Sequence, residues 1–227
     1  MKKIIGLLLG QIRKWDVKTS KSVTQFVANA QNVADRIKTL YGKDAVVVHP
    51  PLDLDGFKPT GRKESYFLVV AALVPYKRID LAVDAFNELG KPLWIVGAGG
   101  EEVKLKKKAL PHIRFLSWVS DAELREIYAS AQALIFPGEE DFGISPLEAQ
   151  ASGTPVIAYG KGGVLETVRN GETGIFFYEQ TTEALKQSVL SFEKIKFSSQ
   201  ALHKQAESFS RERFKSEFEE VLRSLKS

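Results

Sequence analysis

The stretch ALIFPGEEDFGISPLEAQASGTPVIAYG, residues 133–160, contains two short apolar runs on either side of a segment of helix length. Ala133–Phe136 and Pro155–Tyr159 are rich in β-branched and aromatic residues, which is typical of strands buried on both faces. Between them, Ser145 followed by Pro146 predicts the N-cap and the first residue of a helix. A strand, a helix and a second strand in this order indicate a right-handed crossover between parallel strands.

Further runs of the same kind alternate with helical segments along the chain. Ser120 and Glu123 have the spacing of a capping box, and an apolar stripe at helical spacing ends at Gly90. The additional predicted strands are Tyr66–Ala71, Pro92–Gly97, Ile113–Leu116 and Gly174–Phe177. The sequence therefore predicts an α/β fold: a Rossmann-like parallel sheet with helices on both faces, which binds ligands at the carboxyl ends of its strands.

The composition excludes several classes of protein. The 227 residues include no cysteine, which rules out disulfides and thiolate metal sites, and the three histidines are too far apart for a local metal motif. The net charge of +4 is too small to indicate nucleic-acid binding, and no nucleic-acid motif accompanies it. No apolar run is long enough to span a bilayer. We expect a metal-free cytoplasmic protein, with peripheral contact at the inner membrane face as an alternative.

The pattern of elements divides the chain into four parts. Residues 66–208 hold the Rossmann-like domain, and residues 52–65, which follow two prolines, read as a linker. Residues 1–51 contain one and a half crossover units, too little for an independent domain of this type. Residues 209–227 carry an apolar stripe that needs a surface to cover. We expect the incomplete first part to leave apolar faces open to self-association or to a partner.

The loop after Phe136 has chemical features that point to a ligand. Glu140 and Glu148 are separated by a glycine loop around Gly143, directly before the predicted helix. The first turn of that helix presents unpaired N–H groups and the positive end of the helix dipole, which favour a phosphate. Separately, each acid has a simpler interpretation, because Glu148 could complete a capping box and Glu140 could be a surface residue.

Together these features resemble the retaining GT-B glycosyltransferases of family 4, within the glycosyl transferases group 1. The signature E-x7-E with a Phe-Gly pair inside it matches Glu140 to Glu148. Three more segments resemble the family: LVPYKRIDLAVDAF at Leu73–Phe86, IVGAGGE at Ile95–Glu101, and SGTPVIAYGKGGVLETVRNGETGIFF at Ser152–Phe177. The combination of VPYKR with EEDFGI is similar to the mannosyltransferase-like subgroup.

The resemblance implies a role for each matching residue. Glu140 would bind hydroxyls of the donor sugar and Lys77 would neutralise the departing diphosphate, so these two are the candidate catalytic residues. Glu148 would hold the ribose. The remaining candidates for donor binding are Phe142, Gly143, Ile144, Ser145, Arg78, Gly97 and Gly99. Gly97 and Gly99 have a turn as their alternative interpretation, and Trp118 could flank the base or belong to the core.

One position departs from the family pattern. Where the family has an arginine five residues before the lysine, this chain has Ala72, so one cationic contact is absent unless Arg78 replaces it. A contact of this kind contributes roughly 1.5–3 kcal/mol.

The resemblance also implies the ligands and partners. The expected donor is GDP-mannose, with a UDP-sugar as the second choice and no metal or other cofactor. The acceptor would be a glycan or a lipid-linked molecule. Residues 1–51 resemble only the last part of the family's N-terminal acceptor domain, and the final helix would pack toward that domain.

Two functions remain open at this point. The chain could be the donor-binding half of a hexosyltransferase, inactive alone and dependent on an N-terminal-half polypeptide. Alternatively, it could be a non-catalytic protein that binds sugar nucleotides or a protein partner, which Ala72 favours.

Overall fold

The computed structural model describes residues 2–225, with side chains from residue 8 onward. The chain divides into two compact units: Met1–Pro50 with Phe214–Ser227, and Pro51–Arg213. The predicted linker, residues 52–65, lies in the larger unit. Leu52 is buried there and its N–H donates to the carbonyl of Phe209 at 2.7 Å. The side chains of residues 1–7, within the first predicted part, lie outside the described residues, as do residues 226 and 227 of the last predicted part.

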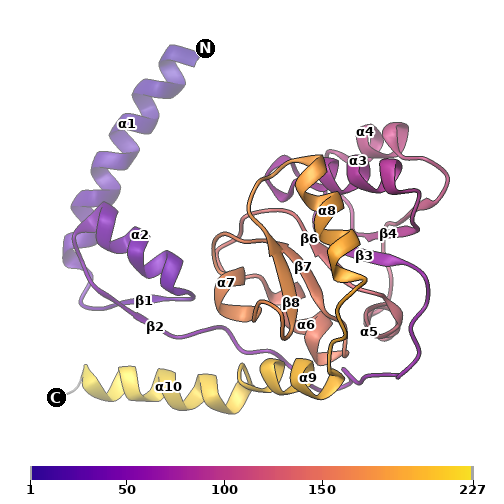
Figure 1. The fold of residues 1–227 in the computed structure, drawn as a ribbon. Coiled ribbons are helices and arrows are strands. Elements are labelled where there is room, and N and C mark those ends of the chain that lie inside the picture. Colours follow the sequence, from indigo (N-terminus) through magenta and orange to yellow (C-terminus); the bar gives the residue numbers. More distant parts are fainter. Residues whose placement is uncertain (1, 226–227) are drawn as a thin grey trace. The chain divides into compact units, whose positions relative to one another are not determined.

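The larger unit is built on a six-stranded, fully parallel sheet (Figure 1). Its strands are β3 (Phe67–Val70), β4 (Leu93–Val96), β5 (Ile113–Leu116), β6 (Leu134–Phe136), β7 (Val156–Tyr159) and β8 (Gly174–Phe177). Each lies within a run that the sequence predicted, and the α/β fold class is confirmed.

Helices cover both faces of this sheet, as Figure 1 shows. The helical elements of this unit are η2 (Pro75–Lys77), α3 (Ile79–Leu89), α4 (Glu102–Lys108), α5 (Asp121–Ser130), α6 (Ile144–Ala151), α7 (Val164–Thr167), α8 (Thr182–Phe192) and α9 (Ser199–Glu207). Alternate strand residues belong to two separate core clusters: Val69 packs with α3 and α8, and Leu68 packs with α5 and α6. The β-strand period of two therefore supplies an apolar side chain to each face.

The order of the strands is β5-β4-β3-β6-β7-β8. The chain proceeds from β3 outward to β5, then returns to the other side of β3 and proceeds outward again from β6 to β8. The strands β3 and β6 are neighbours, and Leu68 of β3 is paired with Leu134 of β6. The loops that follow these two strands leave in opposite directions, and a crevice at such a switch point is the usual ligand position in an open α/β sheet.

The smaller unit contains a parallel pair of short strands. Its elements are α1 (Lys2–Thr19), η1 (Ser20–Ser22), β1 (Phe26–Ala28), α2 (Gln31–Tyr41) and β2 (Ala45–Val47), and α10 (Arg211–Ser224) extends into it from the larger unit. Val27 and Val46 are paired across the two strands and are 40% and 41% exposed. One face of this small sheet is therefore open within its unit.

One local prediction was wrong. The helix predicted to begin with Ser145 as its N-cap begins at Ile144, with Gly143 as the N-cap. The Ser145 hydroxyl donates to the carbonyl of Val70 at 3.4 Å instead, so the tertiary contact with β3 replaces the local cap. Of the two interpretations of Trp118, the core position is excluded, because the residue is 83% exposed. The capping box of Ser120 and Glu123 is confirmed.

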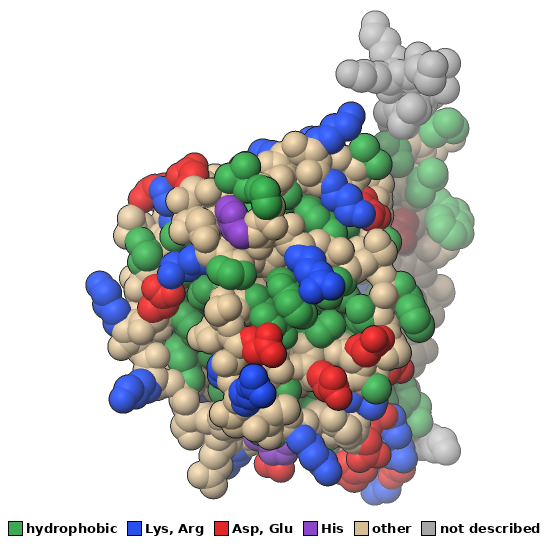
Figure 2. Space-filling model, turned by 90° about the vertical axis from the view of Figure 1, so that its right-hand side faces the viewer, with side chains coloured by type: hydrophobic (Ala, Val, Ile, Leu, Met, Phe, Trp, Pro, Cys, Tyr) green, Lys and Arg blue, Asp and Glu red, His purple; other side chains and the backbone are tan. Residues whose placement is uncertain are grey.

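Basic side chains are dispersed among acidic ones. Figure 2 shows both kinds over one face of the molecule, with hydrophobic side chains gathered between them. On α4, Lys104 and Lys106 form ion pairs with Glu101 and Glu102, which agrees with a solvated helix face. None of the helices in the described part of the chain is both long and apolar enough to cross a membrane.

Candidate functional site

The loop after β3 presents Lys77 at the carboxyl edge of the sheet. Lys77 ends the short helix η2, and Arg78 follows in the left-handed region with φ of 53° before α3 begins. That backbone conformation is uncommon for a residue with a side chain, and it reverses the chain between η2 and α3. The Lys77 side chain is only 15% exposed.

Lys77 forms an ion pair with Glu140, which lies in the loop after β6. The side chain of Glu140 is 20% exposed, so both charges are largely withdrawn from water. The two residues are 63 positions apart in the sequence. They meet because β3 and β6 are neighbours at the switch point of the sheet. The structure therefore brings both candidate catalytic residues together.

Two glycines after β7 hold the backbone around Glu140. Glu140 forms an isolated parallel bridge with Gly162, and the N–H of Gly163 donates to the carbonyl of Glu140 at 2.9 Å. A Cβ on Gly163 would lie 2.2 Å from the carbonyl oxygen of Asp141. Only glycine allows this approach, so the segment after β7 fixes the position of the acidic loop.

The glycine of the acidic loop opens the N-terminus of α6 toward this edge. Gly143 adopts φ of 86°, and as the N-cap it has no side chain with which to cap the helix. Phe142 is buried and its ring lies 5.7 Å from that of Phe209, whereas Ile144 is exposed. The first N–H groups of α6 and the positive end of its dipole are thus available to an anion beside Lys77 and Glu140.

Glu148 lies one turn further along α6, on the face that packs against α5. The hydroxyl of the fully buried Tyr128 donates to Glu148 Oε2 at 2.7 Å. Burial raises the pKa of Glu148, although the Tyr128 hydrogen bond acts in the opposite direction. Burial and the neighbouring carboxylate raise the pKa of Tyr128 well above its usual value. Glu148 and Ile144 also line a pocket of about 240 Å³ with Phe57, Asp121 and Arg125.

The raised pKa of Glu148 predicts how its replacement changes stability. The carboxyl of Glu148 has a higher pKa in the folded protein than in the unfolded chain. Its protonated form therefore stabilises the folded protein fully below the unfolded-state pKa, and this stabilisation is lost as the pH rises through the folded-state pKa. We expect Glu148→Gln to raise the free energy of unfolding at neutral pH, with a gain that disappears as the pH falls toward about 4. Urea unfolding over this pH range measures the difference.

A variant of the other partner provides the control for this contact. Tyr128→Phe removes the hydrogen bond but leaves the buried charge, so it should lower the free energy of unfolding by about 1–3 kcal/mol at neutral pH. If Glu148→Gln destabilised the protein at neutral pH as Tyr128→Phe does, the burial cost of the Glu148 charge would be refuted.

Arg78, Gly97 and Gly99 lie near this site but have other partners. Arg78 Nε lies 3.2 Å from Asp80 Oδ1, and its Nη1 donates to Gln180 Oε1 at 3.4 Å. A Cβ on Gly97 would lie 2.0 Å from the carbonyl oxygen of Ala71, and one on Gly99 would lie 2.4 Å from that of Leu73. The two glycines therefore allow the loop after β4 to lie against the loop after β3.

Sequence reasoning missed several residues that shape the site. Tyr128 reads as an ordinary member of an apolar helix stripe, and nothing in its spacing indicates a hydrogen bond to Glu148. Gly162 and Gly163 gave a stronger signal, since two adjacent glycines after a predicted strand indicate a close backbone approach. Gln180 donates to the carbonyl of Pro137 at 2.9 Å and links Arg78 to the acidic loop. No local motif marks it.

The geometry contains no sign of a metal centre in the described part of the chain. No group of three or more histidine, cysteine, aspartate or glutamate side chains gathers there as a metal site would require. The charged elements of the site are a lysine, two carboxylates and an open helix N-terminus. This set suits an anionic ligand that also carries hydroxyl groups, because ammonium and N–H groups bind phosphate oxygens and carboxylates accept from hydroxyls.

Solved structures of several glycosyltransferases share this fold. Sucrose-phosphate synthase from Thermosynechococcus elongatus superposes with a TM-score of 0.78 at 20% identity, over 88% of this chain and 57% of that one. The pneumococcal O-GlcNAc transferase GtfA, solved with UDP and GlcNAc, has a TM-score of 0.77 at 18% identity, over 92% and 47%. The expected Rossmann-like half of a GT-B fold is confirmed.

Curated relatives are similar in sequence as well. D-inositol 3-phosphate glycosyltransferase of Rhodococcus erythropolis is 30% identical over 191 residues, which are 70% of this chain and 43% of the relative. Its counterpart in Mycobacterium tuberculosis strain H37Ra is 30% identical over 177 residues, which are 66% and 37%. The chain thus spans less than half the length of these relatives.

The family match covers the whole of the site. Residues 53–209 match the family described as glycosyl transferases group 1, and they include both candidate catalytic residues and every candidate for donor binding. This chain therefore belongs to the glycosyl transferases group 1.

Proposed function

We propose that the larger unit is the donor-binding half of a retaining family 4 hexosyltransferase and holds a nucleoside-diphosphate sugar at the switch point of its sheet. The observation that carries this proposal is the pairing of Lys77 with Glu140 beside the open N-terminus of α6. A diphosphate requires positive charge and N–H donors, and a sugar requires acceptors for its hydroxyls. All of these groups meet at one edge of the sheet.

Each group would have a defined part in the transfer. As the bond between sugar and diphosphate breaks, negative charge develops on the leaving phosphate oxygens, where Lys77 and the dipole of α6 would stabilise it. Glu140 would accept from sugar hydroxyls, and Glu148 from the ribose. Because Lys77 and Glu140 neutralise each other in the structure, the donor has to exchange their mutual contact for contacts with phosphate and hydroxyl groups.

The base and the sugar of the donor are open to experiment. The VPYKR and EEDFGI segments favour GDP-mannose through their resemblance to a mannosyltransferase-like subgroup. Two proteins with a similar fold, GtfA and HepE of Anabaena, were solved with UDP, at 18% and 17% identity. A likeness at that level concerns the fold, so GDP-mannose stays our first candidate and a UDP-sugar the second.

The acceptor side requires a second α/β half, from this protein or from another polypeptide. The parallel pair β1 and β2 is too small for a stable sheet alone, and Val27 and Val46 leave one face of it exposed within its unit. The acceptor we propose is a glycan or a lipid-linked molecule. The relatives' name, D-inositol 3-phosphate glycosyltransferase, adds a phosphorylated polyol to the acceptors worth testing.

One observation supports the non-catalytic alternative. The family has an arginine at the position of Ala72, and Arg78 is the candidate to replace it. Arg78 forms an ion pair with Asp80 and a hydrogen bond to Gln180. If Arg78 keeps these partners when the donor binds, the leaving group has one cation fewer than the family pattern provides. Such a chain could bind sugar nucleotides without transferring the sugar.

The proposal predicts selective stabilisation by one class of nucleotide. At about a hundred times its dissociation constant, a donor should add roughly 2.7 kcal/mol to the free energy of unfolding. We expect thermal unfolding with GDP, UDP, ADP and their sugar conjugates to show this shift for one base. The shift should be lost in Glu148→Ala and Lys77→Ala.

Lys108→Ala is the control. It removes a lysine that does not belong to the site and that forms an ion pair with Asp84 at 2.5 Å. No shift with any nucleotide would contradict the donor-site proposal. A shift without sugar transfer, once the N-terminal half is supplied, would support the non-catalytic alternative.

A further inference from the structure

A second pocket lies at the opposite edge of the sheet from Lys77 and Glu140. It has a volume of about 440 Å³, within the range of small-molecule sites. Lys63 precedes β3, Gln132 precedes β6, and Ser152 and Pro155 precede β7, so all four lie at the amino ends of strands. The pocket is therefore separate from the donor site, which is at the carboxyl ends.

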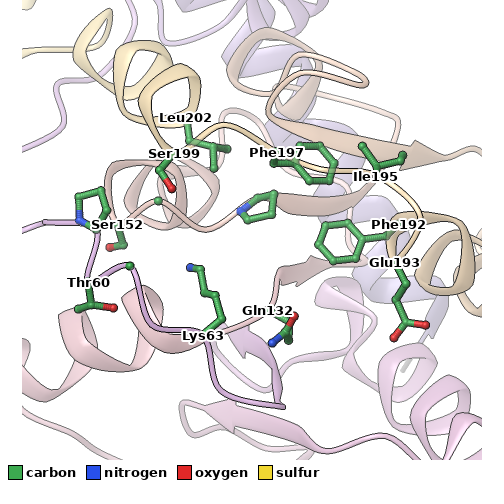
Figure 3. Close-up of a pocket in the computed structure, with 14 residues that line it drawn as sticks. Thr60, Lys63, Gln132, Ser152, Phe192, Glu193, Ile195, Phe197, Ser199 and Leu202 are labelled. Carbon is green, nitrogen blue, oxygen red and sulfur yellow. The ribbon is translucent and has the colours of Figure 1, made fainter.

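Lys63 extends into the middle of this pocket (Figure 3). Its ammonium donates to the hydroxyl of Thr154 at 2.6 Å and to the carbonyl of Ala129 at 2.9 Å. An ammonium has three donors, so these two bonds leave one for another acceptor. Among the described residues no carboxylate forms an ion pair with Lys63, unlike Lys77, Lys106 or Lys108. Although Lys63 is exposed as a whole residue, partial burial of its ammonium lowers the pKa of Lys63 to about 8, so the charged form predominates at neutral pH.

Among the described residues, one other charged side chain lines the pocket, and it does not neutralise Lys63. Glu193 forms an ion pair with Lys91 at 2.7 Å, and in Figure 3 its carboxylate points away from the Lys63 side chain. The pocket consequently holds an uncompensated positive charge. Lys63 is an exposed residue, so an anion that enters the pocket can reach the ammonium and accept its remaining N–H.

The two walls of the pocket differ in chemistry. Figure 3 shows Thr60, Ser152 and Lys63 on one side and Phe192, Ile195 and Phe197 on the other. The rings of Phe192 and Phe197 are stacked, with centroids 5.3 Å apart, and make this side of the pocket apolar. A ligand that fits both walls carries a negative group at one end and an apolar body at the other.

We propose that this pocket is a second binding site, which takes a small organic carboxylate with an apolar body. The carboxylate accepts from Lys63 and the neighbouring hydroxyls, and the apolar body lies against Phe192 and Phe197. The inference does not depend on the donor-site proposal, because the two sites share no residue and lie at opposite edges of the sheet.

The test is a calorimetric titration of the whole chain at neutral pH with benzoate as the probe. Benzamide has the same shape without the charge, and acetate has the charge without the ring. We expect benzoate to bind at least tenfold more tightly than either, because only benzoate satisfies both walls. Equal affinity for benzamide, or no binding of benzoate, would overturn the proposal.

Variants locate the bound probe. Lys63→Met should weaken benzoate binding at least tenfold, whereas Lys204→Met, which removes an exposed lysine of α9 outside the pocket, should not change it. Phe197→Ala shortens the apolar wall and gives a second variant in case Lys63→Met unfolds, as thermal melting would show. Undiminished binding to folded pocket variants, or displacement of benzoate by excess GDP or UDP, would refute this location.

Discussion

Lys77→Met is expected to weaken binding of the nucleoside-diphosphate donor by about tenfold to a hundredfold. The lysine is paired with Glu140 in the loop that leads into α6, and a charge-assisted hydrogen bond to phosphate is worth about 1.5–3 kcal/mol. The variant also leaves Glu140 without its ion-pair partner at a position where the carboxylate is largely buried. Titration with the nucleotide that stabilises the native chain measures the loss.

The control for Lys77→Met is Lys108→Met, which breaks an ion pair with Asp84 between α4 and α3. It should leave nucleotide affinity unchanged. Lys77→Met should bind the nucleoside diphosphate and its sugar conjugate more weakly to a similar degree, because Lys77 contacts the phosphates that both ligands carry. A loss confined to the sugar conjugate would contradict this role and would assign the effect to the orphaned Glu140.

Gly163→Ala is expected to destabilise the protein by about 3 kcal/mol and to remove donor binding. A Cβ at this position would lie 2.2 Å from the carbonyl oxygen of Asp141 and 2.4 Å from the Cα of Phe142. These atoms belong to backbone, which cannot move aside as a flexible side chain does, and overpacking of this kind costs about 1–3 kcal/mol or more. The displaced loop carries Glu140, so binding should be lost along with stability. Urea unfolding and nucleotide titration test the two effects.

Gly100→Ala is a matched control, because a Cβ there would meet no atom within 4 Å. It should change the free energy of unfolding by less than about 0.5 kcal/mol. If Gly163→Ala kept full stability and affinity, the segment after β7 would not position the acidic loop, and the support that Gly163 gives to Glu140 would be refuted.

The sequence was sufficient to predict the six strands of the larger unit and to select candidate residues for a site. Buried parallel strands form continuous apolar runs, and the glycines and capping residues between them mark the turns, so each strand was visible locally. Glu140, Gly143 and Glu148 could be grouped as candidates because the loop and the start of the helix are adjacent in the chain. The exact start of α6 was not found, because Ser145 bonds to Val70, whose position no local pattern reveals.

By itself, the sequence determined the fold class, the strands and the family, since these depend on local periodicity and on motifs that are continuous in the chain. Tertiary structure decided which groups meet. Only the strand order places β3 beside β6 and hence Lys77 against Glu140, and only the packing of α5 on α6 gives Glu148 its bond from Tyr128. Likewise, the pocket around Lys63 exists because the amino ends of three strands meet. Such contacts join residues far apart in the chain, and their geometry is fixed by how the sheet and its helices pack.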